Sequence, residues 1–138
     1  MTPPRLLPTL HENSAFFWRS GADGTLRFLA CDACSYLIHP PAPVCPKCYS
    51  RAVTPQPVSG RGTLHSFTVN VQPWDGVGDV YVIGLVSIDE QPDVRLMTNI
   101  VDIDPQNVKI GMPVEVVFEE HGEVFLPLFR PVSEGDAE

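Results

Sequence analysis

The 138-residue sequence predicts a mostly β protein, in which a short helix and a small metal-binding ribbon precede a five-stranded barrel. All four cysteines lie in two C-x-x-C pairs, and five β-like segments follow them. The 15 prolines and 10 glycines indicate many turns and short elements rather than a helical bundle. We expect four parts: an N-terminal helical segment (1–23), the ribbon (24–58), the barrel (59–132) and a flexible tail (133–138).

Residues 12–21, "ENSAFFWRSG", have the features of a short helix. Asn13 or Ser14 can cap its first amides, and Gly21 suits its end. Its apolar surface comes from three consecutive aromatic residues, Phe16, Phe17 and Trp18. So large a cluster on so short a helix must be covered, either by the rest of this chain or by a partner protein, because aromatic residues are enriched in interface cores.

The next segment, residues 24–34, reads as a strand that leads into the first cysteine pair. The four cysteines have the spacing of two facing knuckles: Cys31, Cys34, Cys45 and Cys48. Such knuckles can place four thiolates tetrahedrally around Zn²⁺, which leaves no open coordination position. The predicted site is therefore structural rather than catalytic.

Other uses of the four cysteines are less consistent with the sequence. Disulfides are disfavoured by the cytoplasmic setting that we expect for this chain. A redox C-x-x-C would need a thioredoxin-like context, which is absent. Iron, in a rubredoxin-like arrangement, remains an alternative to zinc because it uses the same thiolates.

After "SGRG" at 59–62, the sequence changes to segments rich in β-branched and aromatic residues. We predict barrel strands over 63–72, 80–89, 94–101, 114–120 and 124–130. Between the third and fourth, Asp104 is a possible helix N-cap, Pro105 suits the first helical position and Gly111 suits the exit. Five strands with a short helical turn at this place are the OB-fold arrangement, although another five-stranded barrel remains open.

The charge distribution argues against a nucleic-acid partner. The net charge is −8; residues 1–62 carry six basic and three acidic side chains (+3), whereas 63–138 carry three basic and fourteen acidic ones (−11). Four thiolates with Zn²⁺ add about −2, so the N-terminal part falls to about +1. OB-folds that bind single strands need a basic groove with stacking aromatics, and an acidic barrel would repel phosphates.

The sequence also disfavours an autonomous enzyme and a membrane protein. No nucleophile elbow, phosphate-binding loop or cluster of carboxylates and histidines is present, and the histidines are scattered: His11, His39, His65 and His121. The longest apolar run, 80–88, is far shorter than the roughly 20 residues of a membrane-spanning helix. The N-terminus lacks the apolar region of a signal peptide, so we expect a cytoplasmic protein.

Several phrases in order resemble one protein family: "FFWRS", "CDACSYLIHPPAPVCPKC", "VSGRGTLHSFTV", "VIGLVSIDE", "LMTNIVDIDPQNVKIGMPVEVVFEE" and "LPLFRPV". The family consists of OB-fold proteins with a rubredoxin-like zinc ribbon, long described as a domain of unknown function. The resemblance covers residues 12 to about 132, and carries over the four cysteines as metal ligands. It carries over no catalytic residue.

The resemblance implies a non-catalytic partner in acyl-CoA metabolism. Members of this family accompany thiolases or thiolase-like aldolases, including aldolases that cleave steroid side chains, and sometimes a hydratase. This chain would then stabilise such a complex and help to form its acyl-CoA channel. A stand-alone acyl-CoA-binding module is the main alternative, and a single-stranded nucleic-acid-binding OB-fold is the next.

The resemblance also suggests where contacts with a partner and with coenzyme A would lie. Trp74 falls in "QPWDGVGD", between the first two barrel strands, where OB-folds commonly bind ligands; alternatively it caps the barrel end. We expect it to contact the partner together with Phe16, Phe17 and Trp18. The phosphates of coenzyme A could approach Lys47, Arg51 or Arg61, which would otherwise be solvated surface charges.

Overall fold

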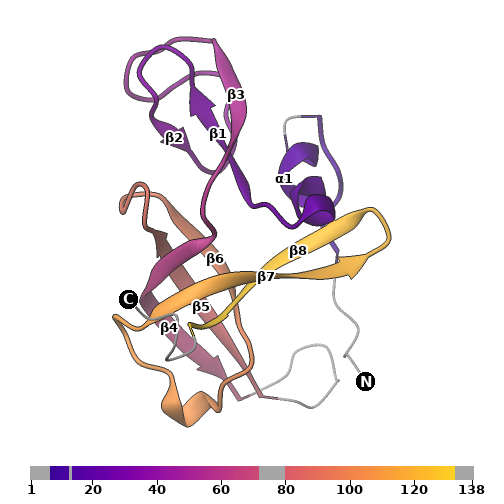
Figure 1. Cartoon of the computed structure of the whole chain (residues 1–138), viewed down its shortest axis with the longest axis vertical. Helices are drawn as coiled ribbons and strands as arrows, with labels where there is room; N and C mark the ends of the chain where they lie inside the picture. Colours follow the sequence, from indigo (N-terminus) through magenta and orange to yellow (C-terminus); the bar gives the residue numbers. More distant parts are fainter. Residues whose placement is uncertain (1–6, 13, 72–79, 133–138) are drawn as a thin grey trace.

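The computed structural model describes residues 7–12, 14–71 and 80–132, which form a small sheet stacked on a closed barrel (Figure 1). The small sheet contains β1 (Arg27–Cys31), β2 (Leu37–Ile38) and β3 (Val53–Pro57) in the order β2-β1-β3, with antiparallel pairing. Its position in the sequence confirms the predicted ribbon, although the first strand is shorter than the predicted 24–34.

The barrel confirms the predicted OB-fold. Its strands are β4 (Arg61–Asn70), β5 (Tyr81–Ile88), β6 (Arg95–Ile100), β7 (Pro113–His121) and β8 (Val124–Pro131), closed in the order β4-β5-β6-β8-β7. The parallel contact between β6 and β8 pairs Ile100 with Phe129. A 3₁₀ turn, η2 (Pro105–Asn107), links the third and fourth barrel strands, as the sequence predicts.

The caps of η2 match the prediction at one end only. The Asp104 carboxylate accepts a hydrogen bond from the Gln106 amide at 3.0 Å, which is the predicted N-cap. Gly111 does not end the turn, because η2 stops at Asn107. Instead, Gly111 adopts a positive φ of 91° in the bend before β7, a conformation that glycine tolerates best.

The predicted helix is shorter than 12–21 and ends differently. It comprises α1 (Ala15–Arg19) and a 3₁₀ turn, η1 (Ser20–Asp23), and Gly24 with a φ of 78° terminates it. Ser14 is the N-cap residue, but its side chain makes no capping hydrogen bond; Asn13 lies outside the described residues. The assignment of Gly21 as the end was therefore wrong.

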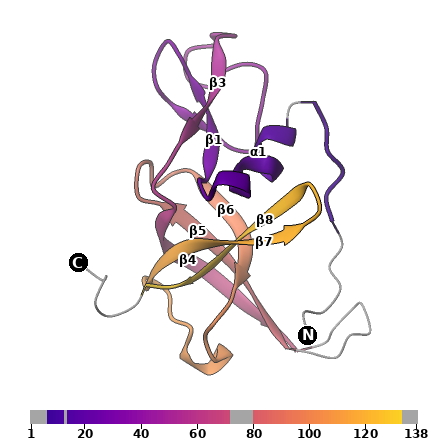
Figure 2. The same ribbon diagram turned by 45° about the vertical axis from the view of Figure 1, so that its right-hand side comes forward.

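Gly21 has a packing role instead. A Cβ atom at this position would lie 2.4 Å from Cδ1 of Phe118 and 2.7 Å from Cβ of Phe125. These rings belong to the β7–β8 hairpin, which lies next to the helix (Figure 2). Only a residue without a side chain lets the helical segment approach the hairpin so closely.

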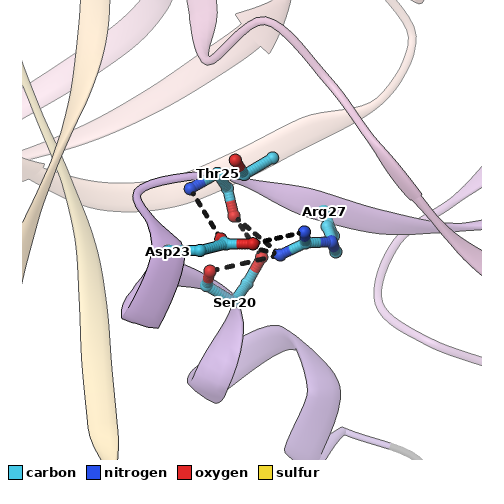
Figure 3. A network of polar contacts seen from close by, with 4 residues as sticks. All are labelled: Ser20, Asp23, Thr25 and Arg27. Carbon is cyan, nitrogen blue, oxygen red and sulfur yellow. Dashed lines mark hydrogen bonds and ion pairs between the residues drawn. The ribbon is translucent and has the colours of Figure 1, made fainter.

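A polar network joins the helical segment to β1 (Figure 3). Arg27 donates from Nη2 to Oδ2 of Asp23 at 2.7 Å and from Nη1 to Oδ1 at 3.1 Å. The same guanidinium donates to the Ser20 carbonyl at 3.3 Å, and the Ser20 hydroxyl donates to the Thr25 carbonyl. The hydrogen bond from Arg27 lowers the pKa of Asp23 to about 2, so the ion pair persists throughout the neutral range.

One hydrophobic core runs from the helix through the small sheet into the barrel. Phe17 of α1 is 2% exposed, and it packs in the same cluster as Phe28 of β1 and Phe129 of β8. The sequence left open whether this chain or a partner protein covers the aromatic cluster of the helix. For Phe17, the chain itself does so. No helix among the described residues is long and apolar enough to cross a membrane.

The β5–β6 turn forms a second connection between sheet and barrel. The Gln91 amide accepts a hydrogen bond from the backbone N–H of Leu37 and donates one to its carbonyl, both at 2.9 Å. Two residues farther along the turn, Asp93 accepts a hydrogen bond from the Tyr36 hydroxyl at 3.1 Å. The side chain of Gln91 thus pairs with β2 much as another strand would.

Candidate metal centre

The four cysteine sulfurs come together at the tip of the ribbon. All four lie within 4.8 Å of one another, and two pairs across the knuckles are closer: Cys31 to Cys48 at 3.5 Å and Cys34 to Cys45 at 3.6 Å. A disulfide bond would need about 2.05 Å. Four sulfurs about 2.3 Å from a tetrahedral metal lie about 3.8 Å apart, so the arrangement fits one metal ion.

The backbone around the two cysteine pairs repeats the same pattern. Cys31 bonds through its N–H to the Tyr36 carbonyl, and Cys45 bonds in the same way to the Ser50 carbonyl, both at 2.9 Å. The residue after each second cysteine, Ser35 or Tyr49, has a positive φ, 66° and 64° respectively. The two turns are therefore nearly identical, which aims all four sulfurs at one point.

Backbone amides hydrogen-bond to the sulfurs, and the thiols differ in the direction in which their pKa is shifted. The amide of Cys34, with that of Ala33, lowers the pKa of Cys31 to about 7, although the side chain is buried. The pKa of Cys45 is also lowered: burial opposes this shift, but the Cys48 and Lys47 amides outweigh it. The first cysteine of each pair is thus the one that loses its proton more readily.

The second cysteines hold their protons more tightly without a metal. The Tyr36 amide lowers the pKa of Cys34, but burial and the neighbouring thiols outweigh it and raise the value to about 12. The pKa of Cys48 is also raised: the Ser50 amide lowers it, and the Cys31 thiol and burial together have the larger effect. A divalent cation would displace these protons, since metals bind thiolates.

The donor set determines what a bound metal could do. Four thiolates complete a tetrahedral shell, so such a metal would have no position for water or substrate and would hold the fold. Among the described residues, these cysteines are the group of His, Cys, Asp and Glu side chains close enough to hold a metal. The site is a structural metal-binding site.

The predicted partner contacts differ in their surroundings. Phe17 contacts both the Phe28 and the His39 ring, with centroids 5.9 and 4.9 Å away, so it serves the core of this chain. Phe16 and Trp18 are half-buried against the same core and stay predicted partner contacts. Trp74 lies outside the described residues.

The predicted phosphate contacts are exposed and lie in two places. Lys47 and Arg51 belong to the second knuckle and its exit, with Lys47 Nζ 5.3 Å from the Tyr36 ring centroid. Arg61 begins β4 of the barrel. Strand β3 (Val53–Pro57) lies between the two places along the chain.

Sequence reasoning missed two residues at the junction between ribbon and barrel. Gln91 is in the middle of a turn and gave no signal beyond its polarity. His39 packs against Phe17 at a tilt of 36° and edge-on to Phe28, with its Nδ1 buried and without a hydrogen-bond partner. Burial lowers the pKa of His39 to about 4. Its signal was its place in the apolar phrase "YLIHPPAPV", which predicts a half-buried neutral imidazole.

A cavity of about 440 Å³ lies beside the Gln91 contact, between the ribbon and the β5–β6 turn. Its acidic lining residues already have partners: Asp32 accepts a hydrogen bond from the Thr54 hydroxyl at 2.7 Å, and Glu90 accepts one from the Ser59 amide at 2.6 Å. His65 is exposed, and His121 pairs with Glu119 at 2.6 Å.

The chain matches two family descriptions in tandem. Residues 18–54 match the "ChsH2, rubredoxin-like zinc ribbon domain", and residues 55–119 match the "ChsH2, C-terminal OB-fold domain". Among solved structures, it superposes with a TM-score of 0.81 on a chain of the "Ltp2-ChsH2(DUF35) aldolase". The two are 35% identical, and the match covers 91% of this chain and 98% of the other.

Two curated relatives give a consistent result. The chain is 34% identical over 99 residues to a "DUF35 domain-containing scaffold protein" of Methanothermobacter thermautotrophicus, covering 67% of this chain and 73% of the relative. It is 36% identical over 126 residues to a "Probable enoyl-CoA hydratase alpha subunit" of Thermomonospora curvata, covering 90% of this chain. The chain spans 39% of the length of that hydratase-named relative. From the tandem match and these relatives, the chain belongs to the ChsH2/DUF35 family of zinc-ribbon OB-fold proteins.

Proposed function

We propose that this chain is a non-catalytic subunit of a thiolase-like enzyme, a thiolase or an aldolase, acting on acyl-CoA. The observation that carries the proposal is the likeness to the ChsH2 chain of an aldolase complex, which extends over 98% of that chain. The name of the archaeal relative, a scaffold protein, supports the same role. Degradation of a steroid side chain is the process that the sequence resemblance suggests.

The chemistry of the described residues supports a non-catalytic role. The cysteine cluster is closed once a metal binds, and His39 is packed between aromatic rings. The described part of the chain contains no second group of metal-ligating side chains. We therefore assign the reaction to the partner, and to this chain the stability of the complex and part of the acyl-CoA channel.

We assign zinc to the cysteine site, in preference to iron. The matched ribbon family is named for zinc, and the four free thiols suit a reducing compartment such as the cytoplasm. Elemental analysis of protein purified without added metal tests this assignment. About one zinc per chain is the expected result; about one iron per chain, with the absorption of an iron–thiolate site, would refute it.

Coenzyme A would meet this chain through its phosphates. Lys47 and Arg51 could contact one phosphate group and Arg61 another, because β3 separates them. These three side chains are exposed and positively charged, although the chain as a whole has a net charge of −8. A stand-alone acyl-CoA-binding module would use the same contacts, so contact with coenzyme A alone does not distinguish the two functions.

Co-expression with a thiolase-like protein from the same organism tests the proposal. We expect the two to co-purify, and light scattering to give the mass of a hetero-oligomer with a fixed ratio of subunits. If the chain stays monomeric, binds no thiolase-like protein, and binds acyl-CoA without a partner, the proposal is refuted and the stand-alone module is favoured. Retention on single-stranded DNA at physiological salt would instead favour a nucleic-acid function.

A further inference from the structure

One side of the barrel has a surface unlike the rest of the chain. It consists of the outward side chains of residues 66–70, 81–87 and 95–99, on β4, β5 and β6, which lie side by side (Figure 1). We call it the outer sheet face. Burial alternates along β5: Val82, Gly84 and Val86 face the inside of the barrel, whereas Ile83 and Leu85 point outward.

The centre of the outer sheet face is apolar. Leu85 of β5 pairs directly with Met97 of β6, so their side chains lie together on the outside. Met97 is 71% exposed, one of the most exposed large apolar side chains described. Ile83 and Leu85 are half-buried and are not among the side chains packed against the core. Their contacts are therefore made on the outer surface.

The same face is almost uncharged. Its outward positions carry one charged side chain, Arg95, and the others are apolar residues or serine, threonine, asparagine and tyrosine. Residues 63–138 as a whole carry fourteen acidic and three basic side chains. An apolar centre without acidic groups, surrounded by neutral polar residues, has the composition of a protein interface core and its rim.

The charges and shape indicate what can cover this face. One arginine is too little positive charge to hold a nucleic-acid backbone. A small ligand needs a concave site, and the described cavity lies elsewhere, at the ribbon. Two copies of this chain would each bring a net charge of −8, which opposes self-association. A different protein with an apolar, weakly charged patch meets none of these obstacles.

We propose that the outer sheet face is the docking surface of this chain for its partner subunit, with Met97 and Leu85 at the centre and Arg95 facing an acidic side chain of the partner. This inference rests on the proposed function. It assigns the contact to the barrel strands that OB-folds commonly use for ligands, and not to the buried Phe17 of α1.

The test introduces a charge into the face and compares it with the same change elsewhere. Met97→Glu is the variant, and Ile110→Glu is the matched control, because Ile110 is 68% exposed and lies in the bend before β7. Affinity of the full-length, metal-loaded chain for the thiolase-like protein is measured by calorimetry. We expect Met97→Glu to weaken binding at least tenfold and Ile110→Glu less than twofold.

A second variant covers the possibility that Met97→Glu does not fold. Arg95→Glu changes an exposed side chain at the edge of the face, and we expect it to weaken binding at least threefold. Thermal unfolding and metal content should match the wild type for every variant that is compared. Both variants binding like the wild type would overturn the docking surface but leave the proposed function intact.

The remaining outcomes also decide the matter. A wild-type chain that binds no thiolase-like protein refutes the proposed function, and the docking surface with it. The wild-type chain could instead form a homodimer that Met97→Glu dissociates. The outer sheet face would then bind a second copy of this chain, and the proposal would be overturned. Sedimentation of the chain alone distinguishes these two outcomes.

Discussion

The barrel and the ribbon fold for different physical reasons. The barrel is built around a core of fifteen buried apolar residues, which also includes Phe17 of α1 and Phe28 of β1. The ribbon tip has a separate cluster of four, Leu29, Cys31, Ile38 and Cys45, of which two are metal ligands. Burial of apolar surface can hold the first cluster, whereas the second is too small and depends on the metal.

This difference matters for a partner subunit. We expect the barrel, held by apolar burial, to keep its surface whatever the metal supply, and the ribbon tip to be ordered only when metal is bound. The Gln91 contact with Leu37 and the packing of Phe17 against Phe28 join the two regions. The two regions can therefore be perturbed separately, at the metal, at the barrel core, or at either connection between them.

Removing the metal should have the largest effect, and it should be local. Structural zinc sites of this kind supply about 10–16 kcal/mol at pH 7. We expect Cys45→Ser to lose the metal and the ordered ribbon, because Cys45 is fully buried. Hydrogen exchange should show lost protection over residues 31–50 and retained protection in β5. Equal loss of protection in both regions would contradict the separation of the two cores.

Truncating a barrel core residue should have the next largest effect. Phe129 is fully buried in β8, so Phe129→Ala should lower the free energy of unfolding by about 3–5 kcal/mol. Urea denaturation measures this change. We expect nearly the same loss with metal bound and after chelation, because the ring is not part of the ribbon cluster. A loss that appears only in the metal-bound chain would argue against an independent barrel.

His39 should make stability depend on pH. Its pKa is about 4 in the folded chain, against about 6.5 when unfolded, so the unfolded chain binds more protons between these values. Stability should therefore fall as the pH drops from about 6.5 to about 4, by up to about 3 kcal/mol. Saturating zinc in every sample limits the separate effect of cysteine protonation.

The control for this prediction is His39→Phe, which keeps a ring in contact with Phe17 and Phe28 and removes the titrating group. Its free energy of unfolding should lose less on acidification than that of the wild type. Identical pH profiles for the two proteins would show that the imidazole does not titrate as its burial implies.

Loosening the junction should have the smallest effect. Gln91→Ala removes two hydrogen bonds to Leu37, which we expect to lower stability by about 1–3 kcal/mol. Gln106→Ala is the matched control, since Gln106 is exposed in η2 and should change stability by less than about 0.5 kcal/mol. Equal values for the two variants would mean that the turn does not fasten the ribbon.

Local sequence patterns predicted most of the architecture. Alternating β-branched residues located the five barrel strands to within a few residues, and the Asp104–Pro105 pair located η2. The cysteine spacing predicted a single cluster of sulfurs. Each of these signals is read from neighbouring residues, which is why one sequence suffices for them.

Long-range packing was out of reach of the same patterns. Gly21 looks like a helix end, but its role depends on Phe118, almost a hundred residues away. From the sequence, Phe17 could equally be a contact for a partner protein. Only the structure shows that it packs against Phe28 and His39. Likewise, nothing near Gln91 indicates that its amide pairs with Leu37.

We propose that this chain completes an enzyme whose chemistry belongs to another chain. The most direct measurement is the turnover of an acyl-CoA substrate by the thiolase-like protein while the metal-loaded chain is titrated into it. We predict no turnover by the chain alone, and an activity of the partner that rises and reaches a plateau at a fixed ratio of subunits. Turnover by the isolated chain, or partner activity and stability unaffected by its presence, would contradict the claim.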